Sequence, residues 1–109
     1  MALQNINPTQ TQAWKNLENH FESMKNNGIK EMFLKETNRA AQFHIQWNDF
    51  LVDFSKNNIT SETMRLLTNL ANEAQLKDAI SKYFEGDIIN QTENRAVLHT
   101  ALRAPESAN

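Results

Sequence analysis

The 109-residue chain has no cysteine, only two glycines and two prolines, and no long apolar run. The absence of cysteine excludes disulfide bonds, thiolate nucleophiles and thiolate metal ligands. The first ten residues have neither the basic head nor the apolar middle of a signal peptide, and no apolar run approaches the length of a membrane span. We therefore expect a cytoplasmic protein with no membrane partner.

An excess of positive charge is also missing. Lys and Arg number 11 against 13 Asp and Glu, which gives a formal net charge of −2 at pH 7. Proteins that bind a phosphate backbone usually carry a basic patch, so nucleic acid is not an expected partner. Gly28 and Gly86 both fall where a helix is expected to stop, and the sequence therefore offers no Gly-rich phosphate loop.

The three histidines, His20, His44 and His99, share no metal-ligand spacing. His44 falls on the outward-facing period of an expected strand, and His20 falls on the flank of an expected amphipathic helix. Both are interpreted as partly exposed polar positions. We predict no metal site, no cofactor and no catalytic residue in this chain.

Apolar residues at three- and four-residue steps predict a mainly helical segment over residues 1–103, followed by a loop at 104–109. Asn7 and Thr60 are the expected N-caps of the first and third helices. A left-handed stop is expected at residues 26–28. Helices are expected at residues 8–25, around residues 30–36, from residue 61 to Gly86 with a break near residues 72–75, and from Thr92 to Pro105.

The expected buried faces follow the same spacing. They comprise Trp14, Leu17, Phe21 and Met24, then Met32 and Phe33, then Met64, Leu67, Leu70, Ala71 and Ala74, then Leu76, Ile80, Tyr83 and Phe84, and last Leu98, Ala101 and Leu102. One modest core is the most that a chain of this length can hold.

The period changes to two over residues 43–54, where apolar and polar residues alternate on both sides of Asn48-Asp49. This pattern predicts a β-hairpin. A two-stranded hairpin is marginal in water, so Phe43, Ile45 and Trp47 must pack against helices or against a missing neighbour. We interpret Trp14 and the hairpin aromatics as core, because aromatic residues at these spacings are more often core than a stacking platform.

Arg95, His99 and Arg103 are spaced four residues apart and would form a cationic stripe on the last helix. Such a stripe could receive an anion. The favoured interpretation is that Arg95 and His99 pair with acidic groups of another element, while Arg103 complements the negative end of the helix. Glu93 in the first turn is interpreted as a helix-stabilising anion and not as a general base.

Two segments resemble one known family. Residues 90–103, NQTENRAVLHTALR, are similar to the N-x-T-E-x-R-A-V-L-H-x-A-L-R segment near the amino terminus of glucose-6-phosphate isomerases. Residues 51–57, LVDFSKN, resemble that family's L-V-D-[FY]-S-K-N strand end, and a helix similar to its T-x-x-T-M-x-L-L pattern follows. Residues 86–90 depart slightly from the family's commoner G-x-x-I-N, which has a basic residue ahead of the isoleucine. The resemblance covers most of residues 43–103.

The resemblance implies an aldose–ketose isomerase that interconverts glucose 6-phosphate and fructose 6-phosphate in glycolysis and gluconeogenesis, without metal or nucleotide. It implies a cytoplasmic homodimer of α/β fold with two sugar-isomerase (SIS) domains, of which this segment is the amino-terminal helical region. The family's glutamate base and phosphate loops belong to segments beyond Asn109, so no catalytic residue carries over. The implied partners are the remainder of the enzyme and the sugar phosphate that it binds.

Within such an enzyme, Arg95, His99 and Arg103 are expected to dock the segment onto the remainder of the protein and not to bind substrate. Arg95→Ala would then lower thermal stability and leave the Michaelis constant nearly unchanged. The alternative to an enzyme segment is a stand-alone helical interaction module that is related to the enzyme's amino terminus.

Overall fold

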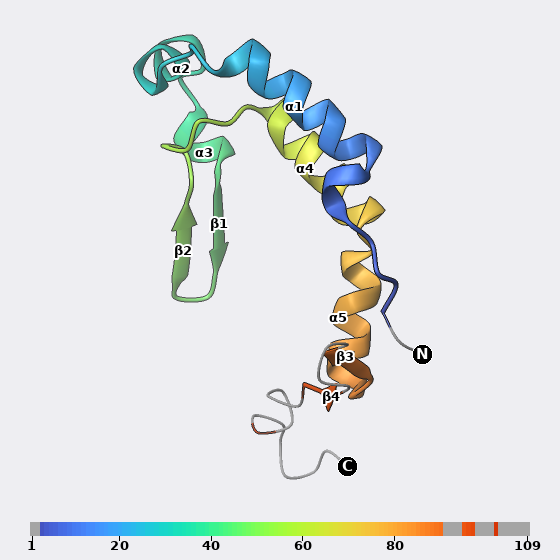
Figure 1. Ribbon diagram of the computed structural model, residues 1–109. Coiled ribbons are helices and arrows are strands. Elements are labelled where there is room, and N and C mark those ends of the chain that lie inside the picture. The colour runs from blue at the N-terminus through green and yellow to red at the C-terminus, as the bar shows by residue number, and fades with distance from the viewer. Residues whose placement is uncertain (1–2, 91–94, 98–101, 103–109) are drawn as a thin grey trace.

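The computed structural model describes residues 3–90, 95–97 and 102. This part of the chain is mainly helical and carries a two-stranded antiparallel hairpin, as the sequence predicts (Figure 1). Its elements are the 3-10 helix η1 (Pro8–Gln10), the helices α1 (Gln12–Met24), α2 (Ile29–Lys35), α3 (Arg39–Gln42), α4 (Ser61–Glu73) and α5 (Leu76–Glu85), and the strands β1 (His44–Trp47), β2 (Phe50–Asp53), β3 (Ile88–Asn90) and β4 (Arg95–Ala96).

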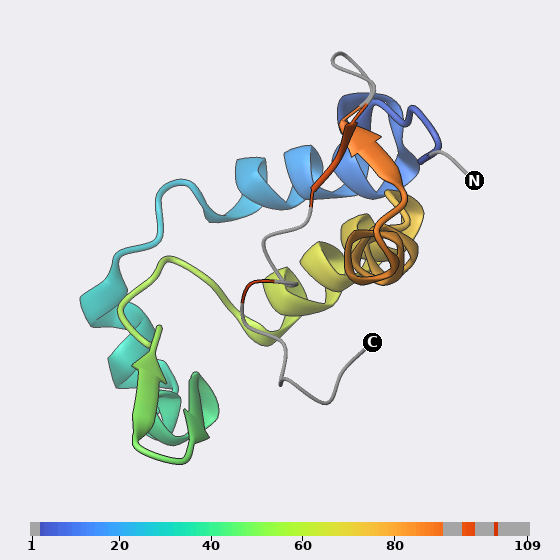
Figure 2. The ribbon, with the colours of Figure 1, turned by 90° about the horizontal axis from the view of Figure 1, so that it is seen from below.

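The arrangement is flat and open. Helices α1 and α4 pack side by side, the hairpin β1–β2 projects from α3 at one end, and α5 continues at the other end (Figures 1 and 2). The radius of gyration is 18.3 Å and the extents are 52 × 38 × 17 Å. A compact domain of about this length has a radius of gyration of roughly 13 Å, so this fold does not close around one core.

The first helix begins later than the sequence predicts. Asn7 is confirmed as a cap, because its side chain accepts a hydrogen bond from the Thr9 N–H at 3.1 Å, but it caps only the short η1. Thr11 has extended backbone angles that interrupt the helix, and its hydroxyl accepts a bond from the Trp14 N–H at 3.1 Å. Two successive caps therefore divide the expected helix at residues 8–25 into η1 and α1.

The two glycines have different roles. Gly86 is confirmed as a left-handed helix stop, with a φ of 79° after α5. The stop predicted at residues 26–28 is wrong, because Gly28 has extended angles (φ −87°, ψ 148°) and is the N-cap of α2. The break between α4 and α5 lies at Gln75, which adopts the left-handed conformation with a φ of 58°.

The start of α4 agrees with its prediction. The Thr63 N–H donates to the Thr60 hydroxyl at 3.3 Å, and the Thr60 N–H donates to the Thr63 hydroxyl at 3.0 Å. This reciprocal pair is a capping box, in which Thr63 takes the place of the more usual Glu or Gln. The direction in which the chain enters α4 is therefore fixed locally.

The core is small, and several predicted buried faces are wrong. The buried hydrophobic residues of the described chain are Ala13, Met24, Met32, Phe43 and Leu66. Helix α4 turns Thr63 and Leu66 inward, while Met64 and Leu67 are exposed. The predicted stripe of α5 is also largely exposed, because no described helix covers it (Figure 1). The exposed members of the predicted faces are Phe21, Met64, Leu67, Leu76, Ile80, Phe84 and Leu102.

The helix predicted from Thr92 is wrong where the structure describes it. Arg95 and Ala96 form β4, which pairs antiparallel with β3 through Ile88↔Ala96 and Asn90↔Arg95, with an irregular register between them. The isoleucines of β3 favour an extended backbone, and their strand offers Arg95 and Ala96 a pairing edge. Leu102, which was expected to face inward, is 86% exposed. The other predicted residues of that helix, and the loop at 104–109, lie outside the described residues.

Candidate functional site

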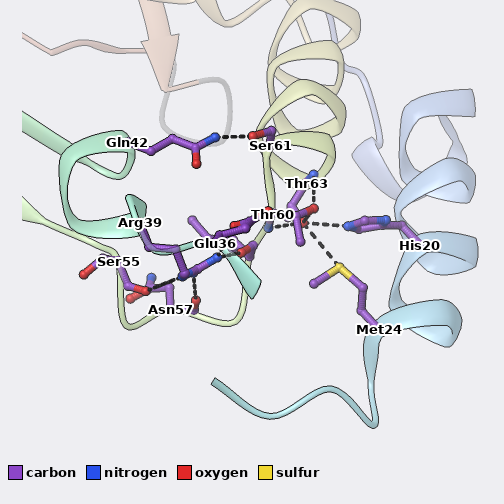
Figure 3. Close-up of polar contacts among 11 residues, drawn as sticks. His20, Met24, Glu36, Arg39, Gln42, Ser55, Asn57, Thr60, Ser61 and Thr63 are labelled. Atoms are coloured by element: carbon purple, nitrogen blue, oxygen red, sulfur yellow. Dashed lines mark hydrogen bonds and ion pairs between the residues drawn. The ribbon is translucent and has the colours of Figure 1, made fainter. Parts of the chain in front are cut away.

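A buried arginine organises the junction between the hairpin and α4. Arg39, the first residue of α3, is fully buried. Its Nε and Nη2 donate to the Ser55 carbonyl at 3.2 and 2.9 Å, and Nη2 also donates to the Asn57 carbonyl at 3.1 Å. Its Nη1 donates to the Ile59 carbonyl at 2.9 Å and to Glu36 Oε2 at 3.1 Å (Figure 3). The loop at residues 54–60 is therefore folded around one guanidinium group.

Aromatic rings enclose the same guanidinium. Its carbon lies 4.7 Å from the ring centroid of Phe43 and 5.4 Å from that of Phe33. A guanidinium presents five donors in a rigid planar fork and is less strongly hydrated than an ammonium group, so it can serve several carbonyls while its faces contact rings. A lysine ammonium group has neither this planar fork of donors nor flat faces that can contact the rings.

The end of β2 prepares this junction. The Ser55 N–H donates to Asp53 Oδ1 at 2.8 Å, and the Ser55 residue itself is buried. Hydrogen bonds from Ser55 hold the pKa of Asp53 below its ordinary value of 3.8, with smaller help from the charges of Lys56 and His44. Because the Ser55 carbonyl binds Arg39, the carboxylate of Asp53 supports the arginine junction through one intervening residue.

A second polar contact joins α1 to α4. His20 Nε2 lies 2.6 Å from the Thr63 hydroxyl oxygen, and that hydroxyl lies 3.5 Å from the sulfur of Met24 (Figure 3). Gln42 of α3 also donates to the Ser61 hydroxyl at the start of α4. These contacts give His20 a structural role and tie the helix pair to the arginine junction.

The hairpin carries an apolar ladder on one face. Its register pairs His44↔Asp53, Ile45↔Val52, Gln46↔Leu51 and Trp47↔Phe50. Side chains alternate between the two faces of a strand, so three cross-strand pairs share one face. We call them the apolar ladder, which comprises Phe43/Phe54, Ile45/Val52 and Trp47/Phe50.

The inner and outer rungs of the ladder differ in burial. Phe43 is buried beside Arg39 and lies 5.9 Å from the ring of Phe54. The four side chains of the outer rungs are 57–66% exposed, and the rings of Trp47 and Phe50 stack 5.8 Å apart with an interplanar angle of 18°. The interpretation of these two aromatics as core is wrong within the described chain, because no described element covers them (Figure 1).

An apolar groove also runs between α1 and α4, with a volume of about 520 Å³. One acidic group at its rim, Glu18, accepts a bond from the Trp14 indole N–H at 2.8 Å, and another, Glu22, accepts one from Lys25 at 2.7 Å. The floor of the groove is apolar and is formed mainly by Trp14, Leu17, Phe21, Leu67 and Leu70.

Arg95 is the one member of the predicted cationic stripe among the described residues, and it does not lie on a helix. Arg95 lies in β4, so a helical spacing of four residues to His99 does not apply to it, and His99 and Arg103 lie outside the described residues. Within the described part of the chain, no group of three His, Asp or Glu residues could hold a metal ion, and no helix has the length and apolar character of a membrane span.

The sequence patterns do not predict the role of Arg39, whose side chain makes five hydrogen bonds. It lies in a four-residue helix that is too short to show a period, and an isolated arginine is usually exposed. The only available signal was the position of Phe33 and Phe43 on either side of it, which becomes meaningful only once the chain folds back on itself.

Comparisons with known proteins agree with the resemblance in the sequence. Residues 53–109 match the family model described as phosphoglucose isomerase. The chain is 58% identical over 106 residues to the glucose-6-phosphate isomerase of Christiangramia forsetii, which covers 97% of this chain and 20% of that protein. It is 55% and 52% identical over 102 residues to the glucose-6-phosphate isomerases of Buchnera aphidicola from Cinara cedri and Schizaphis graminum.

These two Buchnera matches cover 93% of this chain and 19% and 18% of the relatives. The chain thus spans about a fifth of the length of the curated relatives that it matches. The family model covers more than half of the chain, in the segment that begins at the end of β2. The chain belongs to the phosphoglucose isomerase family.

Proposed function

We propose that this chain is the amino-terminal segment of a glucose-6-phosphate isomerase, which interconverts glucose 6-phosphate and fructose 6-phosphate in glycolysis and gluconeogenesis. The proposal rests on the share of this chain and the share of each relative that the alignments cover. The chain matches isomerases of that name over 93–97% of its own length but only 18–20% of theirs. Such a segment contributes packing surface to an enzyme whose reactive groups lie elsewhere.

Three carboxylates of the described chain, Glu36, Asp53 and Glu62, fit this division of roles. Isomerisation of a sugar moves a proton between neighbouring carbons and needs a positioned base of suitable pKa. Glu36 is bound to Arg39, Asp53 to Ser55, and Glu62 to Arg65. These hydrogen bonds lower the pKa values of Asp53 and Glu62, which weakens both groups as bases.

The complete enzyme is further proposed to be a cytoplasmic homodimer with two SIS domains, which acts on its sugar phosphate without metal or nucleotide. Membership of the family supports these proposals. The molar mass of the complete protein in solution tests the dimer, and a monomer at working concentration would count against it.

The competing function is a stand-alone helical interaction module. An independent domain has to bury enough apolar surface to offset the entropy of ordering its chain. In the described residues, five hydrophobic side chains are buried while fourteen large ones are exposed. This ratio favours a segment of a larger protein.

The test uses the complete product of the gene that encodes this chain. A coupled assay should show turnover of fructose 6-phosphate, and Asp53→Asn and Glu62→Gln should leave the turnover number within about twofold of the parent protein, because neither carboxylate takes part in chemistry. A gene product with the 12.6 kDa mass of this chain and no turnover would establish the interaction module instead.

A further inference from the structure

We propose that Asn27 is a site of spontaneous covalent modification, at which the backbone nitrogen of Gly28 attacks the side-chain amide and converts the residue into aspartate and isoaspartate. The inference does not rest on the proposed function. Of the two glycines in the chain, only Gly28 follows an asparagine. The reaction needs an accessible amide carbon, an unbound nucleophile and a backbone that can bring them together.

The reaction consumes water as its only co-reactant and releases ammonia. The Gly28 N–H gives its proton to a base in solution, and the nitrogen forms a bond to Cγ of Asn27. The bond from Cγ to Nδ2 then breaks, and the amide group takes up a proton and leaves as ammonia. The product is a five-membered succinimide ring. Water that cleaves the ring between the nitrogen and Cγ gives aspartate, whereas cleavage at the main-chain carbonyl carbon gives isoaspartate, in which the chain continues through the former side chain.

The attacking nitrogen is accessible and unbound. Gly28 precedes α2 as its N-cap, and its carbonyl accepts a hydrogen bond from the Met32 N–H at 3.1 Å. The Gly28 N–H itself donates to no acceptor in the part of the chain that the structure describes. Gly28 is exposed, and an added Cβ would meet no atom beyond its chain neighbours within 4 Å. A base in solution can therefore reach the N–H, and the missing side chain leaves the approach of the nitrogen unhindered.

The neighbouring asparagine, Asn26, lacks these conditions. Asn26 and Asn27 are both exposed and both lie between α1 and α2. The nitrogen that would attack Asn26 is that of Asn27, whose N–H donates to the Met24 carbonyl at 2.8 Å. Asn16 and Asn19 lie within α1, where the backbone N–H groups bind carbonyls of the preceding turn. Asn26 and Asn27 thus form an internal comparison in which only Asn27 should react.

The products change both the charge and the backbone at the corner between α1 and α2. Asn27 lies at a cavity of about 100 Å³, whose charged lining residues are Glu31, Lys35 and Glu36. A carboxylate at position 27 therefore joins two acidic neighbours and one basic neighbour. Isoaspartate also inserts a methylene group into the main chain, between the bond to the Met24 carbonyl and the first bond of α2. Both changes weaken the start of α2, so its backbone amides should exchange faster in the modified protein.

Timed incubation of the complete gene product tests the proposal. The protein is held at several pH values, and peptides that contain residues 26–28 are analysed by mass spectrometry with electron-based fragmentation, which distinguishes aspartate from isoaspartate. Position 27 should lose its amide several times faster than position 26, and both products should form. The rate should rise with pH, because the Gly28 nitrogen must lose its proton. Equal loss at the two positions, or aspartate without isoaspartate, overturns the proposal. Loss that occurs only after denaturation also overturns it, because the folded protein would then hold the two groups apart.

Gly28→Ser is the matched control. The backbone of Gly28 is extended (φ −87°, ψ 148°), the space beside it is open, and serine is a preferred N-cap residue. The variant should therefore keep α2 intact and lose the Asn27 amide several times more slowly, because its Cβ hinders the approach of the nitrogen. Loss at the rate of the parent protein contradicts attack by this nitrogen.

Hydrogen–deuterium exchange of residues 29–35 measures the structural consequence. Exchange should become faster in the incubated parent protein, in proportion to the fraction of modified chains. It should stay nearly unchanged in Gly28→Ser protein that is incubated for the same time. Unchanged exchange in a fully modified parent protein overturns the expected loosening of α2.

Discussion

The arginine junction and the hairpin beside it differ in how completely their side chains are paired or buried within the described residues. At the junction, one guanidinium binds three carbonyls and a carboxylate, and no buried side-chain nitrogen or oxygen of the described residues lacks a partner. On the hairpin, the outer rungs of the apolar ladder remain open to solvent. Within the described residues, the buried polar groups are thus paired internally, whereas the apolar side chains of the outer rungs are not covered.

This difference has a physical reason. An unpaired polar group in a buried position costs about 1–3 kcal/mol, so such groups must be paired wherever they are buried. An exposed apolar side chain costs much less and becomes favourable as soon as another surface covers it. The Arg39 contacts can therefore hold the base of the hairpin although its outer rungs stay exposed.

The largest expected effect comes from removing the centre of the junction. In the complete protein, Arg39→Ala should lower the free energy of opening of residues 43–60 by about 3–5 kcal/mol, because three carbonyls and the Glu36 carboxylate lose their buried partner. Hydrogen–deuterium exchange of this segment measures the change. Arg39→Lys should recover only part of it, since an ammonium group lacks the planar fork.

Arg65 provides the control for that experiment. It pairs with Glu62 on the exposed surface of α4, with 60% of its side chain accessible. Arg65→Ala should change the opening free energy by less than about 1 kcal/mol. Equal losses for the two arginines would mean that burial of Arg39 does not matter.

The next effect concerns the exposed outer rungs of the apolar ladder. If the remainder of the protein covers the ladder, Trp47→Ala should destabilise the hairpin by about 3 kcal/mol in the complete protein, since a large buried side chain is lost. Gln46→Ala on the opposite face should cost less than about 0.5 kcal/mol. Exchange of β1 and β2 measures both, and a Trp47 cost as small as that of Gln46 would mean that the ladder stays exposed.

A smaller effect concerns the capping box that links the junction to α4. Thr60→Ala should cost about 1 kcal/mol, because the Thr63 N–H loses its acceptor at the helix start. Thr68→Ala is the matched control, since the Thr68 hydroxyl only bonds the Met64 carbonyl within the exposed face of α4. Alanine has the better helix propensity, so this control should be neutral or slightly stabilising.

The smallest expected effect is a shift in titration. The Asp53 carboxyl should titrate below pH 3.8, because its anion accepts hydrogen bonds from Ser55. The folded-state pKa is depressed, so the stabilisation is complete well above pH 3.8 and is lost as the pH falls through the lower folded-state value. Carboxyl carbon-13 resonances follow the titration, with Asp53→Asn used for assignment, and a midpoint at or above 3.8 would contradict the role of Ser55.

Local signals in the sequence account for much of the fold. Alternation over residues 43–54 predicts the hairpin, and Thr60 and Gly86 mark helix ends through their own chemistry. The same signals fail where a residue fits two roles. Gly28 can stop one helix or start the next, and Arg95 fits a helical spacing although it forms a strand with β3.

The sequence by itself determined the family, the hairpin, the principal helix caps and the mainly helical content, because each depends on residues close together in the chain. Only the tertiary structure decided that Arg39 is buried, that Leu66 is buried while Leu67 is exposed, and that the ladder is covered at one end and open at the other. These properties depend on which segments meet in space. Periodicity marks an apolar face but does not identify the surface that covers it.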